Sequence, residues 1–203
     1  MFLLKKIQYN APVILTYTLF SLVILGISFL TNGGSNRLFF SVYRASFTNP
    51  LTYVRLFTHV AGHVDLNHFC GNFLLILLIG PMLEEKYGSR ALLLMMGVTA
   101  AITGGVFILI SGSAMLLGAS GVVFMMILLS SYVNLKKGRI PLTLLLVIVV
   151  FIGQEAVQGV TAADNISHLS HIIGGLCGAA LGYFMNRGKL EGNRAEAEGM
   201  GYA

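Results

Sequence analysis

The sequence predicts an all-α membrane protein, a bundle of six transmembrane helices with both its N- and C-termini in the cytoplasm. Three observations lead to this prediction: the composition, the length of the apolar segments and the placement of basic residues. Of the 203 residues, 56% are hydrophobic and only 10% are charged, and the mean hydropathy is +0.81. In soluble domains about a quarter of the residues are charged. Most of the surface of this protein must therefore face lipid.

Six apolar segments come close to the ~20 residues that an α-helix needs to cross a bilayer core about 30 Å thick. They cover residues 11–30, 65–83, 91–111, 118–135, 140–159 and 167–186. The first exceeds the apolar region of a signal peptide and lacks a convincing cleavage site after it, so we expect a retained anchor helix. Residues 1–10 form a cytoplasmic N-terminal segment, 11–186 the membrane domain, and the polar residues 187–203 a flexible cytoplasmic tail.

Basic residues orient the bundle, because lysine and arginine in short loops stay on the cytoplasmic side. With the N-terminus inside, ten of the 13 basic residues lie at cytoplasmic ends, and only Arg37, Arg44 and Arg55 lie outside. The net charge of +5 therefore follows from topology, without the basic stripe that nucleic acid requires. Outside also lies the long connection 31–64, whose many aromatic side chains favour the headgroup level of the bilayer.

Several polar side chains fall inside the apolar segments, where each is a functional hypothesis because burial in lipid is costly. Segments 65–83, 118–135 and 167–186 all run from outside to inside. The polar groups near their starts therefore converge at one depth beneath the outer surface. These groups are His68, Asn72, Ser120, His168 and His171.

Helix packing predicts which of these groups meet. Gly174, Gly178 and Gly182 follow His171 at i+3, i+7 and i+11, and small residues at this spacing let two membrane helices approach closely. If the neighbour is the helix that starts at Ser120, the imidazole and the hydroxyl come within hydrogen-bonding distance, about 2.6 to 3.2 Å.

This juxtaposition predicts nucleophilic catalysis. A histidine can accept the serine proton, and since no acidic residue lies at the right depth, a dyad of Ser120 and His171 is the simpler arrangement. The oxyanion of the tetrahedral intermediate needs donors, for which His68, Asn72 and the Ser120 N–H are candidates. Gly118 and Gly121 permit the tight turn at the serine.

Each residue also has a structural interpretation. Ser120 could cap a helix, and His68 and Asn72 could join helices by hydrogen bonds. His168 fits a structural or interfacial role, and His59 and His63, at i, i+4 in the outer loop, fit local hydrogen bonding. The coincidence of the polar groups at one depth favours catalysis.

Three motifs in this order resemble the signatures of the rhomboid intramembrane serine proteases. They are HFCGN at 68–72, GASG at 118–121 and SHIIGGLCG at 170–178. The resemblance implies Ser120 as nucleophile, His171 as general base, and His68, Asn72 and the Ser120 amide as oxyanion contacts. The outer loop keeps the family's arginine as Arg55 but has Val54 where tryptophan is common, and Glu84 resembles a structural glutamate.

By this resemblance the substrates are transmembrane segments of other proteins, cut near their outer ends within the lipid bilayer, with no cofactor and no metal. We expect a multi-pass protein of a bacterial cytoplasmic membrane, with the helix at 140–159 and the loop near Asp164 as candidate gate. One alternative is a catalytically silent relative that binds membrane helices. Another is a metal transporter that uses the paired histidines.

Overall fold

The computed structural model describes residues 8–110, 112, 114–133, 142, 146, 149–150 and 165–199, with the side chains of the last range described for residues 169–187. Most of the predicted helix at 140–159, the loop near Asp164 and the side chain of His168 lie outside the described residues. The candidate gate therefore stays a prediction.

Long helices dominate the described residues, as the composition predicts. They are α1 (Pro12–Leu30), α4 (Leu66–Tyr87), α5 (Ser89–Ile110), α6 (Ser120–Ser130) and α8 (Asn165–Gly199). Of these, α1, α4 and α5 are long and apolar enough to cross a membrane, and α6 is apolar but shorter, at 11 residues. The fold is that of a helical membrane protein, while the count of six spans and the cytoplasmic termini stay predictions.

Helix α8 continues beyond residue 186, where we expect the sixth membrane segment to end. Its backbone stays helical to Gly199. The sequence AEAE at 195–198 explains part of this length, because alanine and glutamate are strong helix formers. The α8 backbone therefore continues as a helix across the predicted boundary between the membrane domain and the polar tail.

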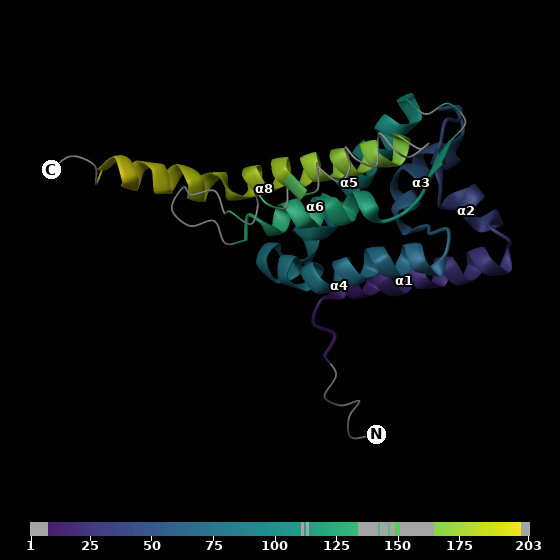
Figure 1. Cartoon of the computed structure of the whole chain (residues 1–203), viewed down its shortest axis with the longest axis horizontal. Helices are drawn as coiled ribbons and strands as arrows, with labels where there is room; N and C mark the ends of the chain where they lie inside the picture. The colour runs from purple at the N-terminus through teal and green to yellow at the C-terminus, as the bar shows by residue number, and fades with distance from the viewer. Residues whose placement is uncertain are drawn as a thin grey trace, which may run out of the picture.

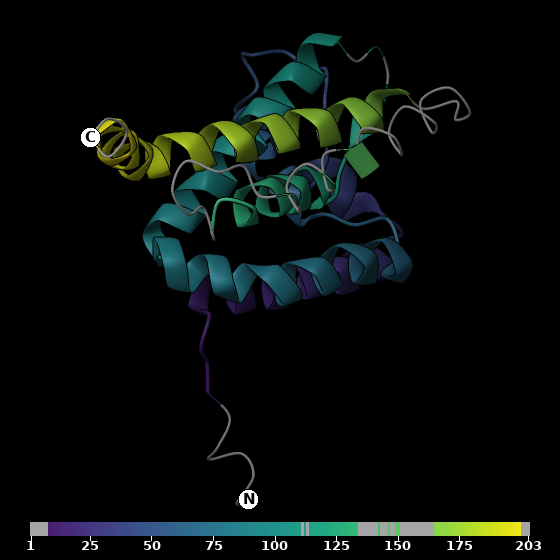
Figure 2. The same cartoon turned by 60° about the vertical axis from the view of Figure 1, so that its left-hand side comes forward.

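The helices form two packed pairs. Helix α1 lies beside α4, and α6 lies against α8, with α4 also contacting α6. Figure 1 shows α1 and α4 along one side of the bundle and α8 along the opposite side, and Figure 2 shows α6 between α8 and α4. Side chains from both pairs form one core, in which Phe73, Ile76, Met125 and Leu129 are buried.

The long connection 31–64 is folded rather than irregular. It contains α2 (Gly34–Phe39), β1 (Val42–Tyr43), α3 (Pro50–Thr58) and the short 3-10 helix η2 (His59–Ala61). Strand β1 pairs antiparallel with β2 (Met115–Leu116), which leads towards Ser120. This small sheet was not predicted, because two residues per strand leave no alternation to detect.

Arg55 anchors this connection. Its Nε donates to the Leu38 carbonyl at 2.9 Å, its guanidinium lies 4.4 Å from the centre of the Tyr43 ring, and its side chain is buried. The neighbouring Val54 is exposed. The connection is therefore held by the arginine, without an aromatic side chain at position 54.

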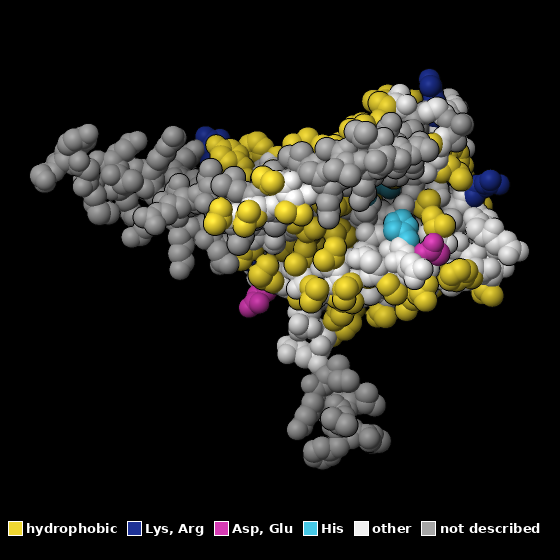
Figure 3. Space-filling model, in the orientation of Figure 1, with side chains coloured by type: hydrophobic (Ala, Val, Ile, Leu, Met, Phe, Trp, Pro, Cys, Tyr) yellow, Lys and Arg dark blue, Asp and Glu magenta, His cyan; other side chains and the backbone are white. Residues whose placement is uncertain are grey.

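Hydrogen bonds between helix ends show which helix ends lie together at each end of the bundle. The Glu84 carboxylate, near the end of α4, accepts hydrogen bonds from the N–H groups of Val13 and Ile14 at the start of α1, at 2.9 and 3.1 Å. Lys86 donates to the carbonyl of Tyr132, just after α6, at 2.6 Å. The starts of α4, α6 and α8 therefore lie together at the opposite end, beside α2 and α3 (Figure 1). On the face seen in Figure 3, hydrophobic side chains cover much of the described surface, and histidine is visible in a hollow towards this end.

Candidate active site

Ser120 begins α6 and is half-buried. The N-cap position is Ala119, and no side chain caps this helix start. The first N–H groups of an α-helix lack intrahelical acceptors, and within the described residues the Ser120 N–H has none. The serine is therefore not a helix cap, and its amide is free to donate to another group.

The turn before Ser120 requires glycine at position 118 for two reasons. Gly118 has a φ of +128°, which side chains rarely adopt. A Cβ there would also lie 2.7 Å from Cε1 of His68. The missing side chain lets the His68 imidazole lie against the backbone that leads to Ser120.

Helices α6 and α8 are in backbone contact along their length. A Cβ on Gly174 would lie 2.8 Å from Gly121 Cα, and one on Gly178 would lie 2.8 Å from Met125 Cα. Gly182 faces the Tyr132 ring in the same way. All three glycines expected to pack therefore face α6 or the turn after it, and the first of these contacts lies next to Ser120.

His171 lies one turn before Gly174 and so faces the start of α6. Its ring is 4.8 Å from the ring of Phe124, which is one turn after Ser120. The His68 ring of α4 lies against Gly118, two residues before Ser120. The structure thus brings Ser120, His171 and His68 to one place from three helices. The Ser120 hydroxyl has no hydrogen-bond partner among the described residues, and catalytic hydrogen bonds often tighten only when substrate binds.

Asn72 is buried at the same end of α4. Its Nδ2 donates to the carbonyl of His68 at 3.0 Å and lies 3.4 Å from Nε2 of His63. Both of its N–H groups are therefore engaged. As an oxyanion donor, Asn72 would have to give up one of these bonds, and the contact with His63 is the longer.

The sequence did not predict that His63 binds the turn before Ser120. Its ring is fully buried, and its Nε2 accepts a hydrogen bond from the N–H of Ala119 at 3.3 Å. Only its Nδ1 bonds locally, to the Ala61 carbonyl at 3.3 Å. Burial, reinforced by the nearby His68, lowers the pKa of His63 from its usual 6.5 to about 4, so the ring is neutral at pH 7.

His59 supports the same turn through its backbone. Its carbonyl accepts the Gly118 N–H at 2.9 Å, while its Nδ1 bonds to the Arg55 carbonyl at 3.1 Å and its Nε2 lies 3.5 Å from the Thr103 hydroxyl. Burial lowers the pKa of His59 to about 4 as well. The rings of His59 and His63 thus face different hydrogen-bond partners.

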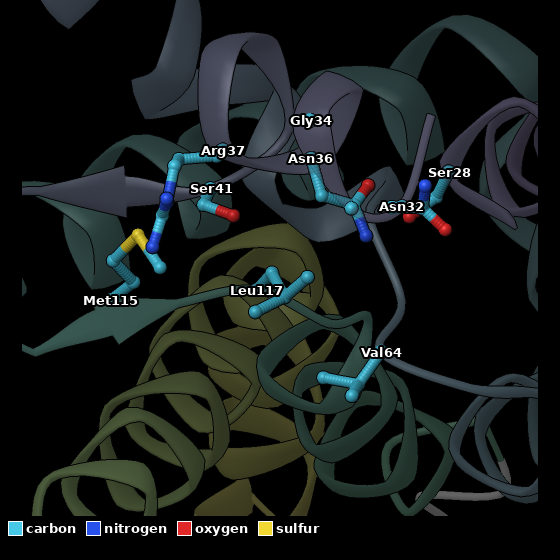
Figure 4. A pocket seen from close by; sticks show the side chains of 10 residues that line it. Ser28, Asn32, Gly34, Asn36, Arg37, Ser41, Val64, Met115 and Leu117 are labelled. Atoms are coloured by element: carbon cyan, nitrogen blue, oxygen red, sulfur yellow. The ribbon is translucent and has the colours of Figure 1, made fainter. Parts of the chain in front are cut away.

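A pocket of about 340 Å³ lies beside the strand that leads to Ser120 (Figure 4). Asn36 and Arg37 come from α2, and Met115 and Leu117 come from β2 and the residue after it. The Asn36 side chain is buried and donates through Nδ2 to the His63 carbonyl at 2.8 Å. This pocket wall is thus bonded to the histidine that holds the serine turn.

Three helices long and apolar enough to cross a membrane, together with a half-buried serine and a half-buried histidine at the starts of two adjacent helices, define a membrane protein with a candidate hydrolytic site. The chain belongs to the rhomboid family, because the sequence model of the rhomboid domain matches residues 50–188. It is also 28% identical over 179 residues to the rhomboid protease GluP of Bacillus subtilis (strain 168), an alignment covering 84% of this chain. That alignment spans only 35% of the relative's length.

Proposed function

We propose that this protein is an intramembrane serine endopeptidase that cleaves transmembrane segments of other membrane proteins with a Ser120–His171 dyad. The observation that carries the proposal is the backbone contact between Gly121 and Gly174. This contact supports the proposed pairing, because Ser120 directly precedes Gly121 and His171 lies one turn before Gly174. Membership of the rhomboid family and the similarity to a rhomboid protease support the same activity.

In the first step, the Ser120 hydroxyl oxygen attacks a substrate carbonyl carbon while His171 accepts the hydroxyl proton. The carbonyl oxygen becomes an oxyanion, for which the Ser120 N–H and the His68 ring are the available donors. Asn72 can join them by releasing His63. His171 then returns its proton to the departing amine, which leaves an acyl-enzyme that water hydrolyses with His171 as base.

The position of Ser120 in a helical membrane protein also favours one kind of substrate. A helix hides its carbonyls in intrahelical hydrogen bonds, so a transmembrane segment must unwind locally before Ser120 can attack. Substrates with helix-weakening residues at the outer end of the span fit this requirement. We place the enzyme in a bacterial cytoplasmic membrane, with the serine near the outer surface.

The test combines cleavage of a single-span membrane substrate with labelling by a serine-reactive fluorophosphonate. Ser120→Ala should abolish both cleavage and labelling, and His171→Ala should reduce them to background. Ser130→Ala is the matched control, because Ser130 lies at the other end of α6 and its hydroxyl only donates to the Ile127 carbonyl. Cleavage retained in Ser120→Ala refutes the proposal. A folded wild-type protein that binds substrate but neither cleaves nor labels supports the catalytically silent alternative.

A further inference from the structure

Two consecutive amides of the serine turn bond to the segment His59–His63, and the third does not. The Gly118 N–H donates to the His59 carbonyl at 2.9 Å, and the Ala119 N–H donates to the His63 ring at 3.3 Å. The Ser120 N–H has no acceptor within the described part of the chain. The bonded pair therefore fixes the backbone directly before the Ser120 amide.

The partners of His63 define its tautomer. The Ala61 carbonyl can only accept, so Nδ1 carries the proton, and the Ala119 N–H can only donate, so Nε2 carries the lone pair. The same lone pair faces Nδ2 of Asn72 at 3.4 Å. A neutral imidazole of one tautomer thus satisfies three polar groups from three segments of the chain.

We propose that His63 is a positioning residue that holds the Gly118–Ser120 turn and the Asn72 amide in the arrangement that serves the oxyanion. It touches neither substrate nor the reacting atoms. The inference rests on the proposed function, since it assigns His63 a role in the reaction of Ser120.

The proposal requires an acceptor at the position of Nε2. Without it, the buried Ala119 N–H and one N–H of Asn72 lose their partner, and a buried donor without a partner is costly. The turn can then rotate to find another acceptor, which turns the Ser120 N–H away from the oxyanion. Such a change affects the transition state more than substrate binding, so it lowers kcat rather than raising KM.

The experiment compares His63→Leu with His63→Gln in the full-length protein, in detergent or vesicles. Leucine fills the space but offers no acceptor, whereas the glutamine Oε1 can accept near the position of Nε2. We measure the rate constant for labelling of Ser120 by a fluorophosphonate, kcat and KM for a single-span substrate, and thermal unfolding. His63→Leu should lower the labelling rate and kcat about 10²-fold, in line with loss of an oxyanion donor, with KM within about threefold. His63→Gln should recover at least a tenth of the wild-type rate.

Thr52→Val is the control, because it removes another buried polar group of the connection 31–64, whose hydroxyl donates to the Ser46 carbonyl at 2.9 Å and does not bind the serine turn. It should lose stability yet label within about threefold of wild type once folded. A folded His63→Leu protein that labels and cleaves like the control overturns the inference, as does a folded His63→Gln protein that is as slow as His63→Leu.

A second variant keeps the test decisive if His63→Leu does not fold. Asn36→Ala keeps the His63 ring but removes the donor that holds the His63 carbonyl from the pocket wall in Figure 4, so the ring is less firmly positioned. We expect labelling to fall about threefold to tenfold, in line with the loss of one hydrogen bond, and an unchanged rate overturns the inference. Failure of the proposed function is distinct, because wild-type Ser120 would then not label at all.

Discussion

The two ends of the bundle both bury polar groups, but they use them differently. At the end with the cytoplasmic termini of our topology, Glu84 binds the N–H groups that start α1, and Lys86 binds a carbonyl just after α6. These bonds satisfy helix termini. At the other end, His63 and the His59 carbonyl bind the turn before α6, while the Ser120 N–H and hydroxyl have no partner among the described residues.

The difference teaches how a reactive group can persist in an apolar protein. A helix start without partners would ordinarily be capped, as Asp65 caps α4 by accepting from the His68 N–H at 2.8 Å. At the start of α6, the N–H groups of Gly118 and Ala119 are hydrogen-bonded, whereas the N–H and hydroxyl of Ser120 have no partner among the described residues. We therefore expect substitutions that disturb the Ser120 turn or the helix packed against it to change chemistry, and substitutions at the Glu84 end to change stability alone.

After loss of Ser120 or His171 itself, the largest effect should come from Gly174→Ala, because the added carbon would overlap the Gly121 backbone and force α6 and α8 apart at the site. We expect fluorophosphonate labelling and cleavage to fall at least 10²-fold, since small displacements at a catalytic centre are that costly.

Gly97→Ala is the control for this substitution. Gly97 is also in a long helix, but a Cβ there meets nothing within 4 Å. Alanine should be neutral or slightly stabilising at such a position. Equal labelling of the two variants would show that the α6–α8 contact does not position the serine.

These two glycines show what the sequence could and could not predict. The spacing of Gly174, Gly178 and Gly182 predicts a close helix contact, because periodicity records which face of a helix is small. The same reasoning brings Ser120, His68 and His171 to one end from the direction of each helix. It could not predict that the His63 ring reaches the Ala119 N–H, because that bond depends on the path of the connection before α4, and sequence spacing alone favours local bonds.

The helix lengths show the same limit. The apolar segments predict α1, α4 and α5 to within a few residues, because length and hydropathy are fixed by the bilayer. They place the end of α6 at residue 135, whereas the helix ends at Ser130. Apolar composition continues through the turn after it, so hydropathy carries no stop signal there.

The next prediction concerns the effect of low pH on stability, which should arise from two buried histidines at the Ser120 end of the bundle. Burial lowers the pKa of both His59 and His63 to about 4, so between pH 6.5 and pH 4 the unfolded chain binds protons that the folded protein does not. Stability therefore falls as the pH is lowered through this range, by on the order of 3 kcal/mol for each histidine. Thermal unfolding in detergent between pH 7 and pH 4 measures this dependence.

The variant that carries both His59→Gln and His63→Gln isolates this contribution, because glutamine does not titrate. Its unfolding temperature should depend less on pH over the same range than that of the wild type. Asp65 and His68 lie near His63 and act on its charge in opposite directions, and both are unchanged in the variant. An equally steep dependence in the variant would assign the acid sensitivity to other groups.

The smallest effect we predict is at the opposite end. Glu84 is buried and binds the Val13 and Ile14 amides and the Ser89 hydroxyl, the last at 2.6 Å. Glu84→Gln keeps the shape but replaces one acceptor oxygen with a donor and removes the charge that favours the start of α1. We expect a loss of about 2 kcal/mol in the free energy of unfolding, while the labelling rate of the folded fraction stays within about twofold of wild type. If that rate instead falls tenfold with the fold retained, the two ends of the bundle are coupled and the division between stability and chemistry fails.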